Sequence, residues 1–188
     1  LARAAELHLD AGAGPEHAVA ERLPDLGDAV LAQEQALADL AQRYGFAQRV
    51  VVTARGYSYP TAREAALKLV ETCYVSAHAY SGADLLHGPL DIVDAEMPVI
   101  AILGNGVGGE AMRPVLPKLR AAGADLFCIG ATRLLADCDP CFRIDGVEES
   151  LSPVVEILPL QLLTLHLAIA RGGNPDAPRG LSKVTETL

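Results

Sequence analysis

The chain has 188 residues, of which 51% are apolar, and its formal net charge is -9 with no cluster of Lys and Arg. A negative surface argues against nucleic acids and anionic membranes as partners. The length and apolar content are sufficient to bury the core of one domain without disulfides or a structural metal.

The N-terminal part of the chain carries helical patterns only. Apolar residues at helical spacing predict helices over residues 1–9 and 27–42, and a Gly- and Pro-bearing stretch over residues 11–24 separates them. The chain begins with Leu1 and shows no strand before residue 46. We therefore expect a piece of a longer polypeptide, in which residues 1–45 are helices that connect two domains.

A strand and a helix follow. Arg49–Ala54 is a short, β-branched run that leads into Gly56, which is typical of a buried parallel strand followed by a ligand loop. The next segment, Pro60–Ala77, is predicted to be a helix. Pro60 suits its first turn, where a missing N–H costs little.

The rest of the chain alternates strands and helices. The patterns predict strands over Met97–Leu103, Asp125–Gly130 and, weakly, Phe142–Ile144, with helices over Gly109–Ala121 and Ser152–Arg171. This alternation predicts a three-layer, doubly wound α/β domain with a parallel sheet. Ligands of such sheets bind beyond the carboxyl ends of the strands, where the loops 56–61 and 104–109 fall.

The last predicted helix is strongly apolar. Glu156 and Pro159 interrupt its apolar run, and we therefore expect a core helix, because a membrane span needs about 20 consecutive apolar residues. No cationic, signal-like segment precedes it. We expect a cytoplasmic protein with no membrane partner.

The cysteines predict no metal. Cys138 and Cys141 have the C-x-x-C spacing of a metal or redox pair, and Cys73 and Cys128 lie in apolar runs. A structural zinc site needs four ligands, and no second pair is present. We expect free thiols in a reducing compartment.

Three charged residues share one face of the helix predicted over residues 60–77. Glu64, Lys68 and Glu71 are spaced four and three residues apart, so their side chains project in one direction. One interpretation is a solvated helix face with an ordinary Glu–Lys pair. The other is an active-site stripe, because the opposite helix face is apolar and the stripe begins one turn after the ligand loop.

Two side chains of this region could transfer protons. The carboxylate of Glu71 can serve as a general base. His87, held in the turn His87-Gly88-Pro89, can serve as an acid or a base near neutral pH, although the same pattern also fits an ordinary turn histidine.

Four segments of the chain together carry a resemblance to a known family. They are Arg55-Gly56-Tyr57-Ser58-Tyr59-Pro60-Thr61, the stripe on the following helix, His87-Gly88-Pro89-Leu90 and the C-terminal Pro178-Arg179-Gly180-Leu181-Ser182-Lys183. These segments resemble the second sugar-isomerase (SIS) domain of the glutamine:fructose-6-phosphate aminotransferase family. The resemblance runs from about residue 47 to the C-terminus. It implies a flavodoxin-like fold over residues 46–188 with a catalytic tail over residues 174–188.

The resemblance also implies roles for individual residues. Glu71 would move a proton between C1 and C2 of the sugar, and Lys68 would act beside it on the same helix. His87 would assist the opening of the sugar ring. Lys183 would form a Schiff base with the open-chain ketose, for which an amine is a suitable nucleophile. In this family the histidine serves the site of a neighbouring subunit, which implies a homodimer. Glu64 would contact the substrate.

Phosphate ligands are less well marked. Ser58 and Thr61 lie in the loop where backbone N–H groups and a helix start could hold an anion, and we take them as candidate substrate-binding residues. In the family, the first SIS domain supplies most phosphate contacts.

The run Tyr80–His87 looks more like the stand-alone double-SIS deaminases and phosphosugar isomerases than the true aminotransferases, which usually carry charged residues at the positions of Val70 and Leu86 and Glu at that of Asp84. The predicted activity is the interconversion of glucosamine 6-phosphate and fructose 6-phosphate, by deamination or amination. The predicted partner is a hexose 6-phosphate or an amino sugar phosphate, and no cofactor is expected.

Two alternatives stay open. A non-catalytic module that senses sugar phosphates would not need Glu71, His87 and Lys183 together. An NADP-binding domain is the other alternative, because Gly104–Gly109 satisfies G-x-G-x-x-G between a predicted strand and a helix. Against it, Asp125 stands at the start of the next strand rather than at its end, where an acid would bind the ribose, although Arg133 beyond that strand would suit NADP.

Overall fold

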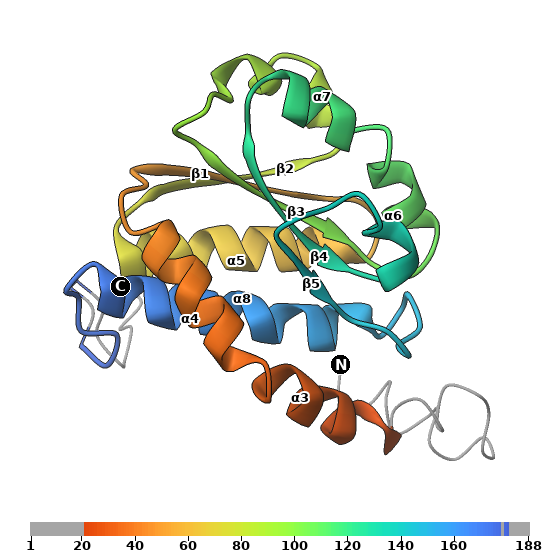
Figure 1. The fold of residues 1–188 in the computed structure, drawn as a ribbon, viewed down its shortest axis with the longest axis horizontal. Coiled ribbons are helices and arrows are strands. Elements are labelled where there is room, and N and C mark those ends of the chain that lie inside the picture. The colour runs from red at the N-terminus through yellow and green to blue at the C-terminus, as the bar shows by residue number, and fades with distance from the viewer. Residues whose placement is uncertain (1–20, 178, 181–188) are drawn as a thin grey trace, which may run out of the picture.

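A five-stranded parallel sheet with helices on both faces forms the fold (Figure 1). The computed structural model describes residues 21–177 and 179–180. The strand order β2-β1-β3-β4-β5 is the flavodoxin-like order and confirms the predicted doubly wound fold. The strands are β1 (Arg49–Ala54), β2 (Ser76–Ser81), β3 (Pro98–Leu103), β4 (Asp125–Gly130) and β5 (Cys141–Arg143).

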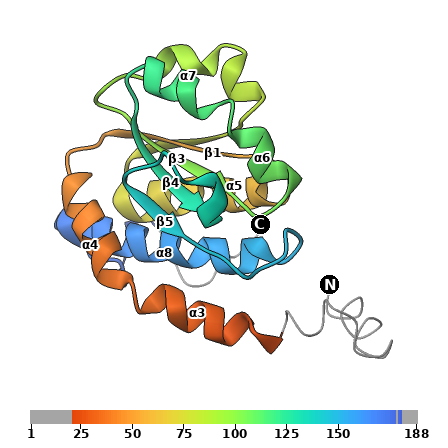
Figure 2. The same cartoon turned by 45° about the vertical axis from the view of Figure 1, so that its right-hand side comes forward.

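The helices divide between the two faces of the sheet, as both ribbon views show (Figures 1 and 2). One face is covered by α3, α4, α5 and α8, and the other by α6, α7 and the short 3-10 helices η1 and η2. The bounds are α3 (Leu23–Leu31), α4 (Glu34–Arg43), α5 (Ser58–Cys73), η1 (Asp84–Leu86), η2 (Pro89–Ile92), α6 (Val107–Met112), α7 (Leu116–Ala121), η3 (Thr132–Leu134) and α8 (Ser152–Ala170).

Alternating strand residues build the two cores. In β1, Val50 and Val52 pack in the cluster shared with α5 and α8, whereas Val51 packs in the cluster shared with α6 and α7. Successive side chains of a strand point to opposite faces, so a strand covered on both faces must be apolar at nearly every position. This requirement explains why β1 and β3 were visible in the sequence as continuous apolar runs.

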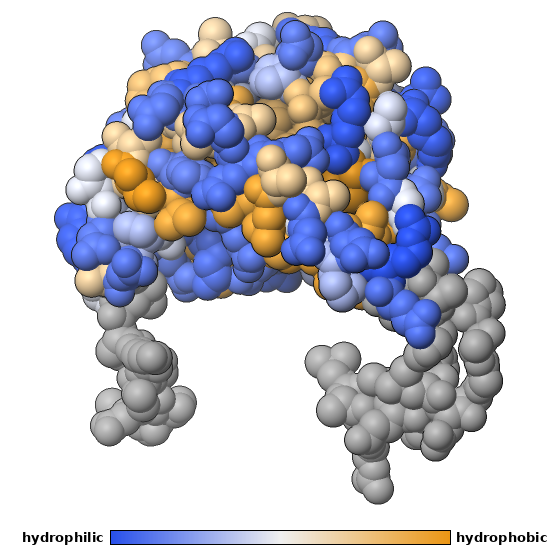
Figure 3. Space-filling view, turned by 60° about the horizontal axis from the view of Figure 1, so that its bottom comes forward, coloured by the Kyte–Doolittle hydropathy of each residue, from blue (hydrophilic) through white to orange (hydrophobic). Residues whose placement is uncertain are grey.

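Helix α8 is a core helix that packs against α3, α4 and α5. Its 19 residues are long and apolar enough to cross a membrane by length and composition, and the helix continues through Pro159. However, Leu160, Leu163 and Leu167 are buried in the core cluster that α8 shares with α4 and α5. The face of the molecule that Figure 3 shows carries hydrophobic residues interspersed with hydrophilic ones.

The structure corrects the prediction between residues 74 and 81. The predicted helix Pro60–Ala77 ends at Cys73, and the missed strand β2 follows at the edge of the sheet. Only one side of an edge strand pairs with a neighbour, and the side chains of β2 are mostly half-buried or exposed. Its sequence, SAHAYS, therefore lacks the apolar run that marks a central strand.

Three other boundaries also differ. The predicted helix Gly109–Ala121 is two helices, α6 and α7, because Pro114 lies in the break and proline cannot donate to the preceding turn. The predicted helix 27–42 is α3 and α4, which Ala32 and Gln33 separate. The weak strand is shifted by one residue to β5.

Candidate functional site

Helix α5 presents the charged stripe that its spacing predicted. Its inner face buries Ala62, Ala65 and Leu69 against the sheet, and this packing turns the opposite face outward. Lys68 Nζ lies 2.7 Å from Glu71 Oε2 and 3.6 Å from Glu64 Oε1. One ammonium group therefore holds two carboxylates together.

Electrostatics within the stripe favour the charged form of Lys68. The hydrogen bond to Glu71 is the largest of the effects that raise the pKa of Lys68, and the charges of Glu71 and Glu64 add to it. Because an ammonium group donates and a carboxylate accepts, Lys68 orients the carboxylate of Glu71. The side chain of Glu71 is 25% exposed, so it remains open to a ligand.

A groove of about 580 Å³ runs beside the stripe, between α5 and the edge strand β2. Glu64, Arg63 and Leu67 line it from the helix, and His78 and Ala79 line it from the strand. Lys68 and Glu71 are not among its lining residues. The groove therefore adjoins the stripe through Glu64 and does not enclose it.

His87 lies on the other side of the sheet from the stripe. Its loop is fixed by Leu85, which is buried in the cluster shared with α6 and α7, whereas α5 packs in the opposite cluster. The His87 N–H donates to the carbonyl of Asp84 (3.0 Å), and the residue is exposed. Within residues 21–177 no hydrogen bond or ion pair joins His87 to Glu71, so one chain does not bring these two candidates together.

The candidate phosphate ligands point inward. Ser58 and Thr61 are 3% and 4% exposed, and Ser58 Oγ donates to Glu156 Oε1 at 3.0 Å. Glu156 lies on α8 and is 1% exposed, and its burial raises the pKa of its carboxyl group. The hydroxyl of Ser58 would have to leave this partner in order to bind a phosphate, and its role as a ligand stays a prediction.

The G-x-G-x-x-G loop is filled by the chain's own carboxylate. Glu149 Oε1 accepts from the N–H of Gly108 (2.7 Å), and its Oε2 accepts from that of Val107 (3.2 Å). A Cβ at Gly106 would overlap the carboxylate of Glu149, so the loop closes tightly around this side chain. These N–H groups are the ones that a dinucleotide pyrophosphate would need.

Arg133, the residue that could have favoured NADP, also has partners in the fold. Its guanidinium donates to Asn105 Oδ1 and pairs with Glu110. Together with the occupied glycine loop, these contacts disfavour the dinucleotide alternative.

Lys183, the candidate for the Schiff base, lies outside the described residues, as does the rest of segment 181–188. The chain is described as far as Gly180, and Arg179 contacts Tyr74 directly after α5. The N–H of Arg179 donates to Tyr74 Oη at 2.6 Å, and its guanidinium lies 4.0 Å from the centre of the tyrosine ring.

The thiols give no metal centre among residues 21–177. Cys73, Cys128 and Cys138 are buried and free, and Cys141 is half-buried and free. No cluster of three potential ligands is present in that part of the chain. Burial raises the pKa of Cys73 to about 11.

Sequence reasoning missed Glu149, Glu156 and Tyr74. A single carboxylate inside an otherwise apolar helix was a usable signal for Glu156, because a buried carboxyl group needs a polar partner. Tyr74 follows α5 in the left-handed conformation (φ 56°), which is normally taken by glycine. Nothing local marks Glu149, whose partners lie more than 40 residues earlier.

The comparisons with known proteins agree with this fold. The model of the SIS domain family matches residues 46–171. A glutamine–fructose-6-phosphate aminotransferase (isomerizing) from Pyrococcus horikoshii is 37% identical over 163 residues, which cover 86% of this chain and 27% of that protein. The chain thus spans about a quarter of the length of the curated relatives it matches.

Solved structures give the same picture. The C-terminal domain of glucosamine-fructose-6-phosphate aminotransferase from Francisella tularensis aligns with a TM-score of 0.78 and 28% identity, over 82% of this chain and 44% of that one. Tagatose-6-phosphate ketose/aldose isomerase from Escherichia coli aligns with a TM-score of 0.67 over 81% of this chain and 44% of that one, and at 21% identity it shows the fold alone. The chain therefore belongs to the SIS domain family and is homologous to the C-terminal SIS domain of glutamine–fructose-6-phosphate aminotransferase.

Proposed function

We propose that this chain is the isomerase half of an enzyme that interconverts glucosamine 6-phosphate and fructose 6-phosphate. The observation that carries the proposal is the triad on α5, in which Lys68 lies 2.7 Å from Glu71 and 3.6 Å from Glu64. The membership of this chain in the SIS family supports a phosphosugar as the ligand.

The proposed reaction moves one proton between two carbon atoms. Glu71 removes the proton from C1 of the open-chain ketose, which is held as a C2 imine. The electron pair of that C–H bond forms a C1–C2 double bond as the π pair of the C2=N bond moves to nitrogen, and the nitrogen takes up the proton that the C1 hydroxyl loses. Glu71 then returns its proton to C2 as the C1–C2 double bond opens and the C1=O bond forms. Lys68 keeps the carboxylate of Glu71 oriented through the hydrogen bond between them. Glu64, at the end of the stripe nearer the groove, contacts the sugar.

Two further groups complete the proposed site. Lys183 forms a Schiff base with the ketone of the open-chain sugar and releases water. Ammonia then displaces the lysine from C2, and the resulting imine makes the neighbouring C–H bond more acidic. His87 assists ring opening in the site of a second subunit, because its loop lies on the far side of the sheet from α5. This arrangement requires a homodimer, and we place the protein in the cytoplasm.

The first test is chemical. The natural protein that carries this chain is incubated with glucosamine 6-phosphate in the absence of glutamine, and free ammonia and fructose 6-phosphate are measured together. Appearance of both products supports deamination coupled to isomerisation. If neither product forms, and glutamine with fructose 6-phosphate also gives no reaction, a different phosphosugar or a sensing role replaces the proposal.

A substitution then tests the base. Glu71→Gln should abolish isomerisation but retain substrate binding, because the amide keeps the shape of the side chain but cannot take the proton. Glu96→Gln is a suitable control, since Glu96 is exposed in the loop before β3. Unchanged turnover in Glu71→Gln would remove this residue from the mechanism.

A further inference from the structure

The strand β2 forms one open edge of the sheet, and β5 forms the other. β5 has three residues, one of which is the charged Arg143, and short, charged edges discourage pairing with another chain. β2 has six residues in continuous register with β1, and its sequence SAHAYS contains no Lys, Arg, Asp, Glu or Pro. It therefore lacks the features by which proteins protect an exposed edge.

The pairing with β1 shows which backbone groups β2 leaves open. The N–H of Ser76 donates to Gln48 O at 2.9 Å, and the register continues without a break to Ser81. Because the direction of these groups alternates along a strand, the N–H and C=O groups of Ala77, Ala79 and Ser81 point away from β1. Within residues 21–177 these groups have no backbone partner on another segment.

An edge with this pattern is complementary to a second copy of itself. In an antiparallel pair centred on Ala79, a two-fold axis places Ala79 opposite Ala79, and Ala77 opposite Ser81 of the other copy. In each of these pairs the outward groups face each other and exchange two N–H···O=C bonds. All the open groups of the three residues therefore find partners.

On the α5 side of this edge, the groove of about 580 Å³ leaves apolar side chains uncovered. Leu67 and Val70 line it from the helix and are 47% and 44% exposed. Ala77 and Ala79 line it from the strand, and their small side chains leave room beside a paired edge. A two-fold contact uses the same patch on both copies, so the second copy would bring its own apolar residues to this groove.

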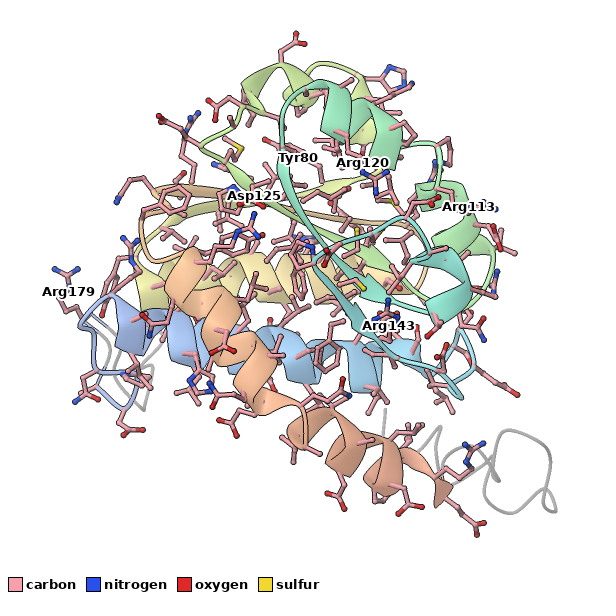
Figure 4. All side chains as sticks on the ribbon, in the orientation of Figure 1. Tyr80, Arg113, Arg120, Asp125, Arg143 and Arg179 are labelled. Atoms are coloured by element: carbon pink, nitrogen blue, oxygen red, sulfur yellow. The ribbon has the colours of Figure 1, made fainter. Side chains whose placement is uncertain are left out.

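The opposite face of β2 carries two aromatic side chains. The rings of His78 and Tyr80 are stacked with their centres 6.2 Å apart, and Tyr80 packs on the side of the sheet away from α5 (Figure 4). In the pair centred on Ala79, His78 of one copy lies opposite Tyr80 of the other, at a position without hydrogen bonds, where side chains are closest. Aromatic cross-strand pairs stabilise a sheet.

The charges of this face suit a second copy. The chain carries a formal net charge of -9, so copies repel each other over much of their surface. On the groove side, however, Arg63 and Lys68 balance Glu64 and Glu71. Arg63 is exposed and forms no hydrogen bond or ion pair with another residue that the structure describes. Because a two-fold contact meets its own patch, a patch that carries both signs is complementary to itself.

We propose that β2 is the interface of a homodimer, in which two copies join their sheets antiparallel about a two-fold axis at Ala79. The proposed function already requires a homodimer, and this inference goes beyond it by naming the surface that forms it. The inference does not depend on the reaction, because it follows from the edge strand and the face beside it.

The test is a pair of cysteine substitutions in the natural protein that carries this chain. In Ala79→Cys the two introduced thiols lie opposite each other, with about 5.5 Å between the Cα atoms, which is within the range of about 4.4–6.8 Å that a disulfide spans. Ala77→Cys is the matched control on the same face of the same strand. Its thiol lies four residues, or about 14 Å, from its counterpart along the paired strands.

Oxidised glutathione serves as the oxidant, and peptide mapping locates the disulfides. We expect Ala79→Cys to give a dimer linked through the introduced thiols and Ala77→Cys to give none. The double variant Ala77→Cys, Ser81→Cys places each thiol opposite the other kind, so it should be linked as well. Amide hydrogen exchange of the wild-type protein should be slow at all three outward N–H groups, because each donates to the other copy.

The absence of a link in both Ala79→Cys and the double variant would overturn the proposal. Fast exchange in wild type would then show an open edge, and slow exchange would show that another segment of the protein covers it. Equal linking of Ala79→Cys and Ala77→Cys would also overturn it, because random collisions or another register would explain the result. A link in Ala79→Cys but not in Ala77→Cys supports the interface even if glucosamine 6-phosphate is not converted, so the two proposals fail separately.

Discussion

Removal of the carboxylate of Glu149 tests whether this side chain occupies the glycine-rich loop that follows β3 and stabilises the fold there. In Glu149→Ala, the N–H groups of Gly108 and Val107 lose the acceptors that lie 2.7 and 3.2 Å away. Gly108 is buried and Val107 is 80% exposed, so water can replace only the second bond.

The expected loss follows from these two bonds. A hydrogen bond to a charged group contributes about 1.5–3 kcal/mol when its loss leaves a buried partner unpaired, and a solvated one contributes about 0.5 kcal/mol. We therefore expect the free energy of unfolding to fall by about 2–3 kcal/mol, which corresponds to about 5–10 °C in melting temperature for a domain of this size. Glu149→Gln keeps one acceptor oxygen and should lose about 1 kcal/mol.

The assay is urea unfolding followed by circular dichroism, in which the midpoint should shift without a change of slope. Glu148→Ala is the matched control, because Glu148 is exposed one position away, and it should change stability by less than about 0.5 kcal/mol. Equal stabilities of Glu149→Ala and Glu148→Ala would refute the reasoning. Binding of NADPH by the wild-type protein would refute the claim that this loop is closed to dinucleotides.

Three further predictions concern buried groups. Burial raises the folded-state pKa of Glu156 above its usual value of 4.5, so its contribution to stability is complete below the unfolded pKa and is lost as the pH rises through the folded pKa. Glu156→Gln should therefore gain stability relative to wild type as the pH rises above the usual pKa of the carboxyl group, and a difference in urea midpoints that does not change with pH would contradict this. Arg171→Ala leaves three carbonyls without their donor and should cost about 2–4 kcal/mol, which Arg171→Lys should not restore because one ammonium lacks the planar fork; a lysine variant with wild-type stability would show that charge alone suffices. In native protein at pH 8, a thiol reagent should react with the half-buried Cys141 before the buried Cys73, whose pKa is raised to about 11, and peptide mapping that finds Cys73 labelled first would contradict the buried position.

Local periodicity along the chain is sufficient to predict several parts of this protein. The strands β1, β3 and β4 were predicted to within a residue, because a strand covered on both faces must be apolar at nearly every position. The stripe Glu64, Lys68 and Glu71 was equally predictable, since helical spacing alone brings such residues together. The quoted motifs gave the family, which the comparisons confirm.

The tertiary structure decided what depends on residues distant in the chain. The strand β2 has no apolar run and exists because β1 pairs with it. Ser58 faces Glu156 across 98 residues of chain, and His87 is separated from α5 by the sheet. Tyr74 meets Arg179 105 residues later. No local pattern encodes these contacts, because the packing of α8 and the order of the strands bring the partners together.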